Sequence, residues 1–170
     1  LARKGFRHLL EAKGLQPQIF ETINTLLRER GLMMNQGTLV DASIIDAPSS
    51  TKNKDKARDP QMHQTRKGNQ WYFGMKAHVG VDADSGIVHS LETTTAKVHD
   101  SQVWDELLHG GETSVWADKG YVSAAREAAF SGPGTFWGVI RKAPKDGALH
   151  PVDEDINRII LPISFDETKE

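Results

Sequence analysis

Two aspartates stand at positions where an ionised side chain needs a partner. Asp41 interrupts the aliphatic and β-branched run Gly37–Ile45, and Asp118 directly follows the short apolar run Thr113–Ala117. A carboxylate in such surroundings needs a metal ion, a cation or several hydrogen bonds to offset its lost hydration. If the two runs are neighbouring strands, the carboxylates meet at one sheet edge. A hard divalent cation with oxygen ligands would then relieve their repulsion.

The other ionisable residues form weaker metal patterns. His78, His89, His99 and Asp100 lack a compact ligand spacing, so a transition-metal site is not favoured. The segment Asp82–Gly86 has the first acidic residues of a calcium loop but not its later ligands or its bidentate glutamate. It is predicted to be a hairpin turn instead.

Length and composition predict a soluble, self-sufficient fold. A chain of 170 residues can bury roughly two thirds of its unfolded surface. It contains no cysteine, which excludes disulfides and thiolate zinc sites and is compatible with a reducing cytoplasmic compartment. No apolar run approaches the ~20 residues that span a bilayer, and no signal-peptide pattern opens the sequence. We therefore expect no membrane partner.

The charge is unevenly distributed along the chain. The net charge is -2, yet the stretch from Lys52 to His78 contains seven Lys or Arg against two Asp, a local +5 that leaves -7 for the rest. Such an asymmetry predicts a basic patch, and a polyanion such as DNA is the partner that it suits. A solvated, non-functional surface is the alternative. The predicted DNA-binding residues are Lys52, Lys54, Lys56, Arg58, Arg66, Lys67 and Lys76.

The elements that must position the two aspartates follow from the apolar spacing. Residues 1–33 show three- and four-residue spacing and predict two helices, broken at Gly14–Pro17. The Asp41 run predicts a central strand buried on both faces. An exposed loop is expected over 48–60, strands over 71–81, 87–94, 113–117 and 135–140, and helices over 100–109 and 123–130.

This order predicts the fold class. Three antiparallel strands followed by alternating helices and strands suit a mixed α/β sheet covered on both faces. The consecutive aromatic residues Trp71, Tyr72 and Phe73 are expected to pack on both faces of their strand. Asp46 falls on the opposite strand face from Asp41, because side chains alternate along a strand, and is interpreted as structural.

Three strings of residues carry a family resemblance. They are TLVDASIIDAPSSTKNK from Thr38, GNQWYFGMKAHVGVD from Gly68, and ADKGY from Ala117. Together they resemble the DDE transposases of bacterial insertion sequences, of the IS-five type, over roughly Phe6 to Arg141. The resemblance implies a small helical segment over 1–33, remaining from a larger N-terminal region, and a ribonuclease-H-like catalytic domain over 34–170.

The resemblance also implies an activity. Enzymes of this family cut and join DNA with Mg²⁺ or Mn²⁺, and Asp41 and Asp118 match the first two acids of their Asp, Asp, Glu triad. The implied partners are terminal inverted repeats and target DNA, with self-association in the active assembly. The implied location is the bacterial cytoplasm, at the nucleoid.

The C-terminal part departs from the family pattern. The family places its Glu on a helix after the last strand, within a Tyr, Arg, Glu, Lys signature that this sequence lacks. Glu154, Glu167 and Glu170 are the remaining glutamates, and none can be assigned as the third acid. Pro162 would also break or kink a helix there. The sequence therefore predicts that a frameshift or truncation removed the catalytic helix, leaving a remnant that is weak or inactive.

Two other function classes stay open. The chain could be a noncatalytic DNA-binding fragment that uses the basic loop but no metal. It could also be another ribonuclease-H-like nuclease, for example one that acts on RNA. Titration with Mg²⁺ or Mn²⁺ separates the first alternative from a transposase, and a panel of nucleic acid substrates separates the second.

Overall fold

The computed structural model describes residues 2–49, 51 and 57–162, and the chain divides into two compact units, Leu1–Met34 and Asn35–Glu170. The first unit contains α1 (Ala2–Lys13) and α2 (Leu15–Glu29). The two predicted helices are confirmed. The break falls at Gly14, whose φ of +58° is the left-handed conformation that glycine adopts without strain. Pro17 lies inside the first turn of α2, where its missing N–H is not needed.

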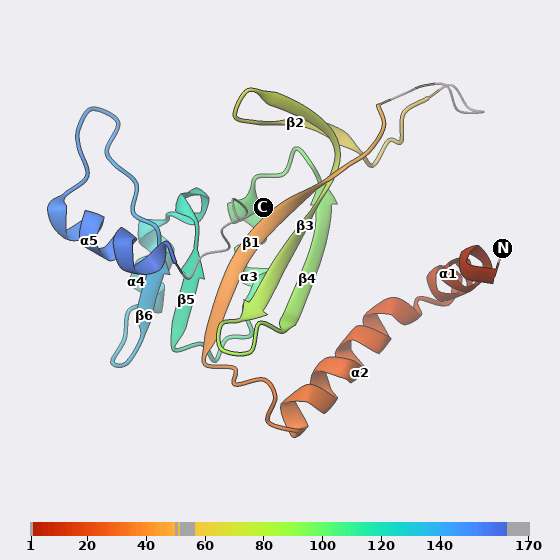
Figure 1. Ribbon diagram of the computed structural model, residues 1–170, viewed down its shortest axis with the longest axis horizontal. Helices are drawn as coiled ribbons and strands as arrows, with labels where there is room; N and C mark the ends of the chain where they lie inside the picture. The colour runs from red at the N-terminus through yellow and green to blue at the C-terminus, as the bar shows by residue number, and fades with distance from the viewer. Residues whose placement is uncertain (1, 50, 52–56, 163–170) are drawn as a thin grey trace. The chain divides into compact units, whose positions relative to one another are not determined.

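The second unit is built on one six-stranded sheet (Figure 1). Its strands run in the order β2–β3–β1–β5–β6, and β4 pairs with β3. Short helices connect the later strands. The elements are β1 (Gly37–Asp46), β2 (His63–Lys67), β3 (Gln70–Asp82), β4 (Val88–Thr95), the 3-10 helix η1 (Asp100–Val103), α3 (Trp104–Leu107), β5 (Ser114–Ala117), the 3-10 helix η2 (Lys119–Tyr121), α4 (Ala124–Phe130), β6 (Phe136–Val139) and α5 (Pro151–Ile160).

The strand directions confirm the predicted fold class. β3 is antiparallel to both β1 and β4, whereas β5 runs parallel to β1 and β6 runs parallel to β5. A mixed sheet of this order, preceded by helices, is a ribonuclease-H-like arrangement. β5 and β6 are parallel neighbours, which cannot be joined by a tight hairpin, and the helical segments η2 and α4 connect them.

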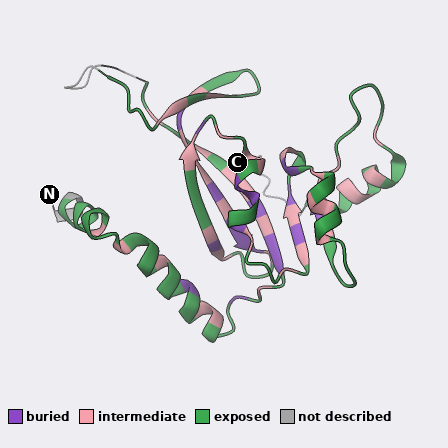
Figure 2. Cartoon of the chain, turned by 180° about the vertical axis from the view of Figure 1, so that it is seen from behind, coloured by how far each residue is buried: buried purple, intermediate pink, exposed green. Residues whose placement is uncertain are grey.

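The core lies on one face of the sheet, under η1, α3, η2 and α4. Trp104 and Leu107 of α3 pack there against strand residues that include Val115, which is fully buried. Tilted aromatic contacts extend this cluster, since the Trp104 ring lies 5.3 Å from that of Trp137 and 5.7 Å from that of Tyr121. Figure 2 shows buried segments concentrated in the middle strands of the sheet and in the α3 region. This packing fixes η1 and η2 beside the strand ends that carry the two aspartates.

The burial of β1 corrects one prediction. Its first half is largely buried, as expected, but Ser43, Ile45 and Asp46 are exposed. The prediction of a strand buried on both faces is therefore wrong for the second half. The physical reason is that β5 stops at Ala117, so β1 continues beyond its parallel neighbour. Asp46 has a structural role, because its Oδ1 accepts the backbone N–H of Phe73 at 3.1 Å.

The region before β3 corrects two further predictions. Residues 63–67, for which no strand was predicted, form β2 and pair with residues 70–74 as the β2–β3 hairpin. β2 was not predicted because its sequence is polar. Neither face of the β2–β3 hairpin requires a row of apolar residues. Trp71 is also not a core residue, because 64% of it is exposed, whereas Phe73 is buried. The Asp82–Gly86 turn is confirmed by the hydrogen bond from the Gly86 N–H to the Asp82 carbonyl.

The helix predicted over 123–130 is confirmed as α4 (Ala124–Phe130). The segment expected to be one helix over 100–109 is divided into η1 and α3. The Ser123 side chain caps α4 by accepting the Arg126 N–H. Across the described residues, no helix is both long enough and apolar enough to cross a membrane.

Candidate functional site

The parallel pairing of β1 and β5 brings the two predicted acids together. The last residue pair of this ladder is Val40 with Ala117, so Asp41 and Asp118 are the next residues on two adjacent strands. Adjacent strands lie about 4.8 Å apart. The two aspartates are therefore neighbours in the sheet, although 76 residues separate them in the sequence.

Asp41 and Asp118 line one pocket of about 220 Å³ at this strand end. The pocket has acidic, basic and hydroxyl groups on its walls, and it involves elements from both sides of β1. Its remaining lining residues are Ala42, Ile44, Thr65, Arg66, Lys67, Lys76, Asp100 and Tyr121. The site thus combines an acid pair with cations of the β2–β3 hairpin, which Figure 1 shows at the far end of β1.

The backbone around Asp118 explains the sequence Asp-Lys-Gly-Tyr. Asp118 Oδ1 accepts the N–H of Gly120 at 2.7 Å and so caps η2. A Cβ on residue 120 would lie only 2.8 Å from that same oxygen, which is closer than van der Waals contact allows. A side chain at residue 120 would therefore displace the Asp118 carboxylate from this hydrogen bond. The turn directs the chain back under the sheet and places Tyr121 in the core.

Lys76 and Asp100 form an ion pair on another wall of the pocket. Lys76 Nζ donates to Asp100 Oδ1 at 2.7 Å and to the Val98 carbonyl at 2.8 Å, and only 11% of its side chain is exposed. A partly buried pair of this length is a strong, charge-assisted contact. It neutralises Asp100, which would otherwise add a third negative charge to the pocket. Neither Asp100 nor Tyr121 was predicted to belong to the site.

The hydroxyl of Tyr121 lacks a hydrogen-bond partner among the described residues. Tyr121 is 1% exposed, and its ring packs against Trp104. Burial, followed by the negative charges of Asp100, Asp41 and Asp118, raises the pKa of Tyr121 far above its usual value of 10. The hydroxyl therefore keeps its proton and remains a neutral donor and acceptor beside the acid pair. A buried hydroxyl without a partner is costly.

The predicted DNA-binding residues fall into three groups. Arg66 and Lys67 line the acid pocket from β2, and Lys76 lines it from β3. The Arg58 guanidinium lies 5.4 Å from the centre of the Phe73 ring and donates to the Ser49 carbonyl, away from that pocket. The others, Lys52, Lys54 and Lys56, lie outside the described residues.

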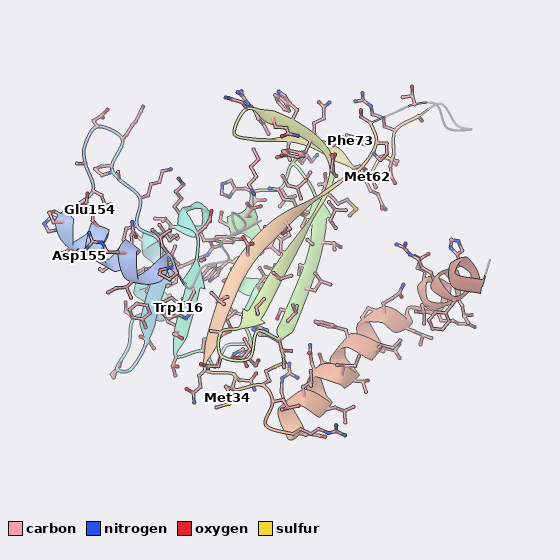
Figure 3. The ribbon with its side chains drawn as sticks, in the orientation of Figure 1. Met34, Met62, Phe73, Trp116, Glu154 and Asp155 are labelled. Carbon is pink, nitrogen blue, oxygen red and sulfur yellow. The ribbon has the colours of Figure 1, made fainter. Side chains whose placement is uncertain are left out.

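A helix does follow the last strand, but its described acids do not line the acid pocket. In α5, Asp153 lies 3.9 Å from the guanidinium of Arg141, and Asp155 pairs with Arg158. Glu154 is exposed. Figure 3 shows Glu154 and Asp155 on the outer part of α5, well separated from β1. Pro162 follows the end of α5 at Ile160, and Glu167 and Glu170 lie outside the described residues.

The acid pocket is chemically suited to a hydrated divalent cation. Within the described parts of the chain, no three His, Asp or Glu side chains gather as a ready ligand group. Mg²⁺, however, commonly uses one or two carboxylates and keeps several waters. Two adjacent aspartates and an unpartnered hydroxyl provide such a set. The donor set fits an oxygen-liganded ion and contains no group that a soft metal prefers.

The fold and the paired acids define the class of protein. A ribonuclease-H-like sheet with one aspartate on β1 and another directly after β5 is the arrangement expected of DDE recombinases. The family described as the transposase DDE domain matches residues 33–158, and the chain therefore belongs to this family. No solved structure matches the chain. Family membership makes this a transposase domain whose general partner is DNA and whose relatives usually use divalent metal ions.

Proposed function

We propose that this chain is the metal-binding and DNA-binding part of an insertion-sequence transposase of the IS-five type, in which Asp41 and Asp118 hold Mg²⁺ or Mn²⁺. The observation that carries the proposal is the position of both acids directly after the last residue pair of the β1–β5 ladder, on one pocket. When bound, divalent ions at such a site activate the attacking oxygen and stabilise the leaving oxygen of an in-line phosphoryl displacement.

The residues of this chain have separate tasks in that chemistry. Asp41 and Asp118 supply carboxylate oxygens at the scissile phosphodiester. Arg66 and Lys67, on β2, reach the same pocket and can neutralise phosphates on either side of the reacting bond. Lys76 and Asp100 also line the pocket, and their ion pair adds no net charge to it. Cutting and joining at inverted repeats require the same arrangement, first with water and then with a 3' hydroxyl as nucleophile.

We further infer that the chain has little cutting activity of its own, because none of its described acids joins Asp41 and Asp118 as a third ligand. The support is that no acid of α5 lines the pocket in the described part of the chain. The same observation favours a second candidate, a noncatalytic DNA-binding fragment. In that case DNA binding would be unchanged when metal is removed with EDTA.

The test of metal binding is a titration of the 170-residue chain with Mn²⁺, followed by electron paramagnetic resonance or calorimetry. Asp41→Asn and Asp118→Asn should each abolish measurable saturation. Asp146→Asn, an exposed aspartate in the loop before α5, is the matched control and should bind as the unmodified chain does. Equal binding by all four proteins would refute the metal site. Mg²⁺-dependent cleavage of inverted-repeat DNA would refute the inference that the chain is inactive.

A further inference from the structure

Tyr121 is the one residue of the acid pocket whose polar atom is buried without a partner among the described residues. The side chain comes from η2, three residues after Asp118, and it is 1% exposed. Its ring is fixed by the core, between Trp104 and the strands. Tyr121 lines the pocket that Asp41 and Asp118 also line, and its hydroxyl is buried without a partner among the described residues. The core therefore holds the ring, and nothing in the described structure satisfies the oxygen.

The cost of this arrangement indicates a function rather than a packing need. Phenylalanine would fill the same volume without burying an oxygen, and buried hydroxyls in folded proteins usually have partners. Lys76 lines the same pocket, but its ammonium is already bound to Asp100 and to the Val98 carbonyl. Lys76 is therefore not the partner of this hydroxyl, and a group that binds in the pocket can take that place.

The charges around the pocket limit what that partner can be. Asp41 and Asp118 line the pocket with Tyr121 and act on its hydroxyl, and their negative charges favour a cation and its bound water at this point. A hydrated cation would bring bound water molecules, which are strong hydrogen-bond donors. A pocket of about 220 Å³ has room for such an ion together with several of its waters.

We propose that Tyr121 is a positioning residue that holds, through its hydroxyl, a water molecule of the divalent ion bound by Asp41 and Asp118. This proposal rests on the proposed metal site and adds a residue to it. Outer groups that orient the surroundings of a metal ion change its affinity measurably, because they fix the geometry of the atoms in contact with the ion. The hydroxyl thus lowers the stability of the metal-free chain, and its hydrogen bond to a bound water stabilises the chain when the ion is present.

The experiment compares Tyr121→Phe with the unmodified chain in metal-free buffer and in Mn²⁺. Without metal, the variant should be more stable, with a melting temperature higher by a few degrees, since an unsatisfied buried hydroxyl has been removed. With Mn²⁺, its affinity should be about two- to tenfold weaker, which is the loss expected for one hydrogen bond. The rise in melting temperature on adding Mn²⁺ should be correspondingly smaller.

Tyr72→Phe is the matched control, because Tyr72 is the other tyrosine of this chain and does not line the acid pocket. It should change neither the Mn²⁺ affinity nor the metal-induced rise in melting temperature. Circular dichroism confirms that both variants are folded, and the higher melting temperature expected for Tyr121→Phe is itself evidence of folding.

The outcomes separate this proposal from the metal site on which it rests. If Asp41→Asn abolishes Mn²⁺ binding while Tyr121→Phe binds Mn²⁺ as the unmodified chain does, the Tyr121 role is refuted and the metal site stands. If Asp41→Asn leaves binding unchanged, both fail. A Tyr121→Phe variant that loses stability without metal would show that the hydroxyl has a structural partner, which also refutes the proposal.

Discussion

The end of the β1–β5 pair and the β2–β3 hairpin line the same pocket, but they are stabilised in different ways. The first has polar groups next to the core, including the buried hydroxyl of Tyr121. The hairpin is a two-stranded extension of the sheet in which Arg66, Lys67 and Trp71 are exposed. The end of the β1–β5 pair is packed against the core and acidic, and the β2–β3 hairpin is exposed and basic.

The difference teaches how one site can bind both a cation and a polyanion. A metal ion needs oxygens held at fixed positions, which packed strand ends provide. A DNA strand needs charge and aromatic surface over a longer path, which an exposed hairpin provides. The segment from Pro60 to Val81 contains no Asp or Glu, so this path carries positive charge alone. Variants of the two regions should therefore affect metal and DNA binding separately.

The largest expected effect is on metal binding. Asp118→Asn should weaken Mn²⁺ affinity by roughly 100-fold or more, because loss of a ligand exceeds the 10- to 100-fold effect of its supporting groups. Its affinity for single-stranded DNA in EDTA should change by less than about twofold. Calorimetry measures the Mn²⁺ affinity, and fluorescence anisotropy with a labelled oligonucleotide measures the DNA affinity. A parallel loss of DNA affinity would mean that the two regions are not separable.

The next effect is expected at the hairpin aromatic. Trp71 is 64% exposed, and the Arg66 guanidinium lies 6.0 Å from its ring centre, an arrangement on which a nucleobase can stack. Trp71→Ala should weaken binding of single-stranded DNA roughly tenfold, because one stacked base contributes about 1–3 kcal/mol. Trp71→Phe should retain most of the affinity.

Ile159→Ala is the control for Trp71, since Ile159 is also 64% exposed but lies on α5. It should bind DNA as the unmodified chain does. If Trp71→Ala changes the sedimentation of the free protein and not its DNA affinity, Trp71 contacts a second copy of the chain instead of a base.

A smaller effect is expected from the hairpin charges. Replacing Arg66 and Lys67 with Ala should reduce DNA affinity several-fold at low salt. The slope of log affinity against log salt should fall by roughly 0.7 for each lost phosphate contact on single strands. Lys145→Ala, in the exposed loop before α5, is the control and should leave the slope unchanged. An unaltered slope in the double variant would remove the hairpin from the DNA path.

The smallest effect concerns acid stability. His78 is fully buried, and burial lowers its pKa below the usual value of 6.5. The unfolded chain therefore binds a proton that the folded chain does not, and stability is lost as the pH falls through 6.5 towards the lower folded pKa. His78→Gln should flatten this dependence of the melting temperature between pH 7 and 5 by a few degrees. His8→Gln, on an exposed side chain, should not; an equal slope in both variants would contradict the assignment.

Much of the fold could be predicted because local signals agreed with it. The helices of residues 1–33, the Asp82–Gly86 turn and the strands that carry Asp41 and Asp118 all follow from apolar spacing and turn residues. β2 could not be predicted in this way, because the alternation that marks a strand depends on one face being buried. The same limit explains why the exposure of Trp71 was not predicted, although its neighbours Tyr72 and Phe73 are more buried.

By itself, the sequence determined the two acids, the strands on which they lie, the basic stretch and the family. The tertiary structure alone decided which strand ends meet, that Lys76 is paired with Asp100, and that Tyr121 lines one pocket with the two acids. The physical reason is that strand identity depends on side chains near in sequence. The composition of a pocket instead depends on register and packing between segments that lie far apart in the chain.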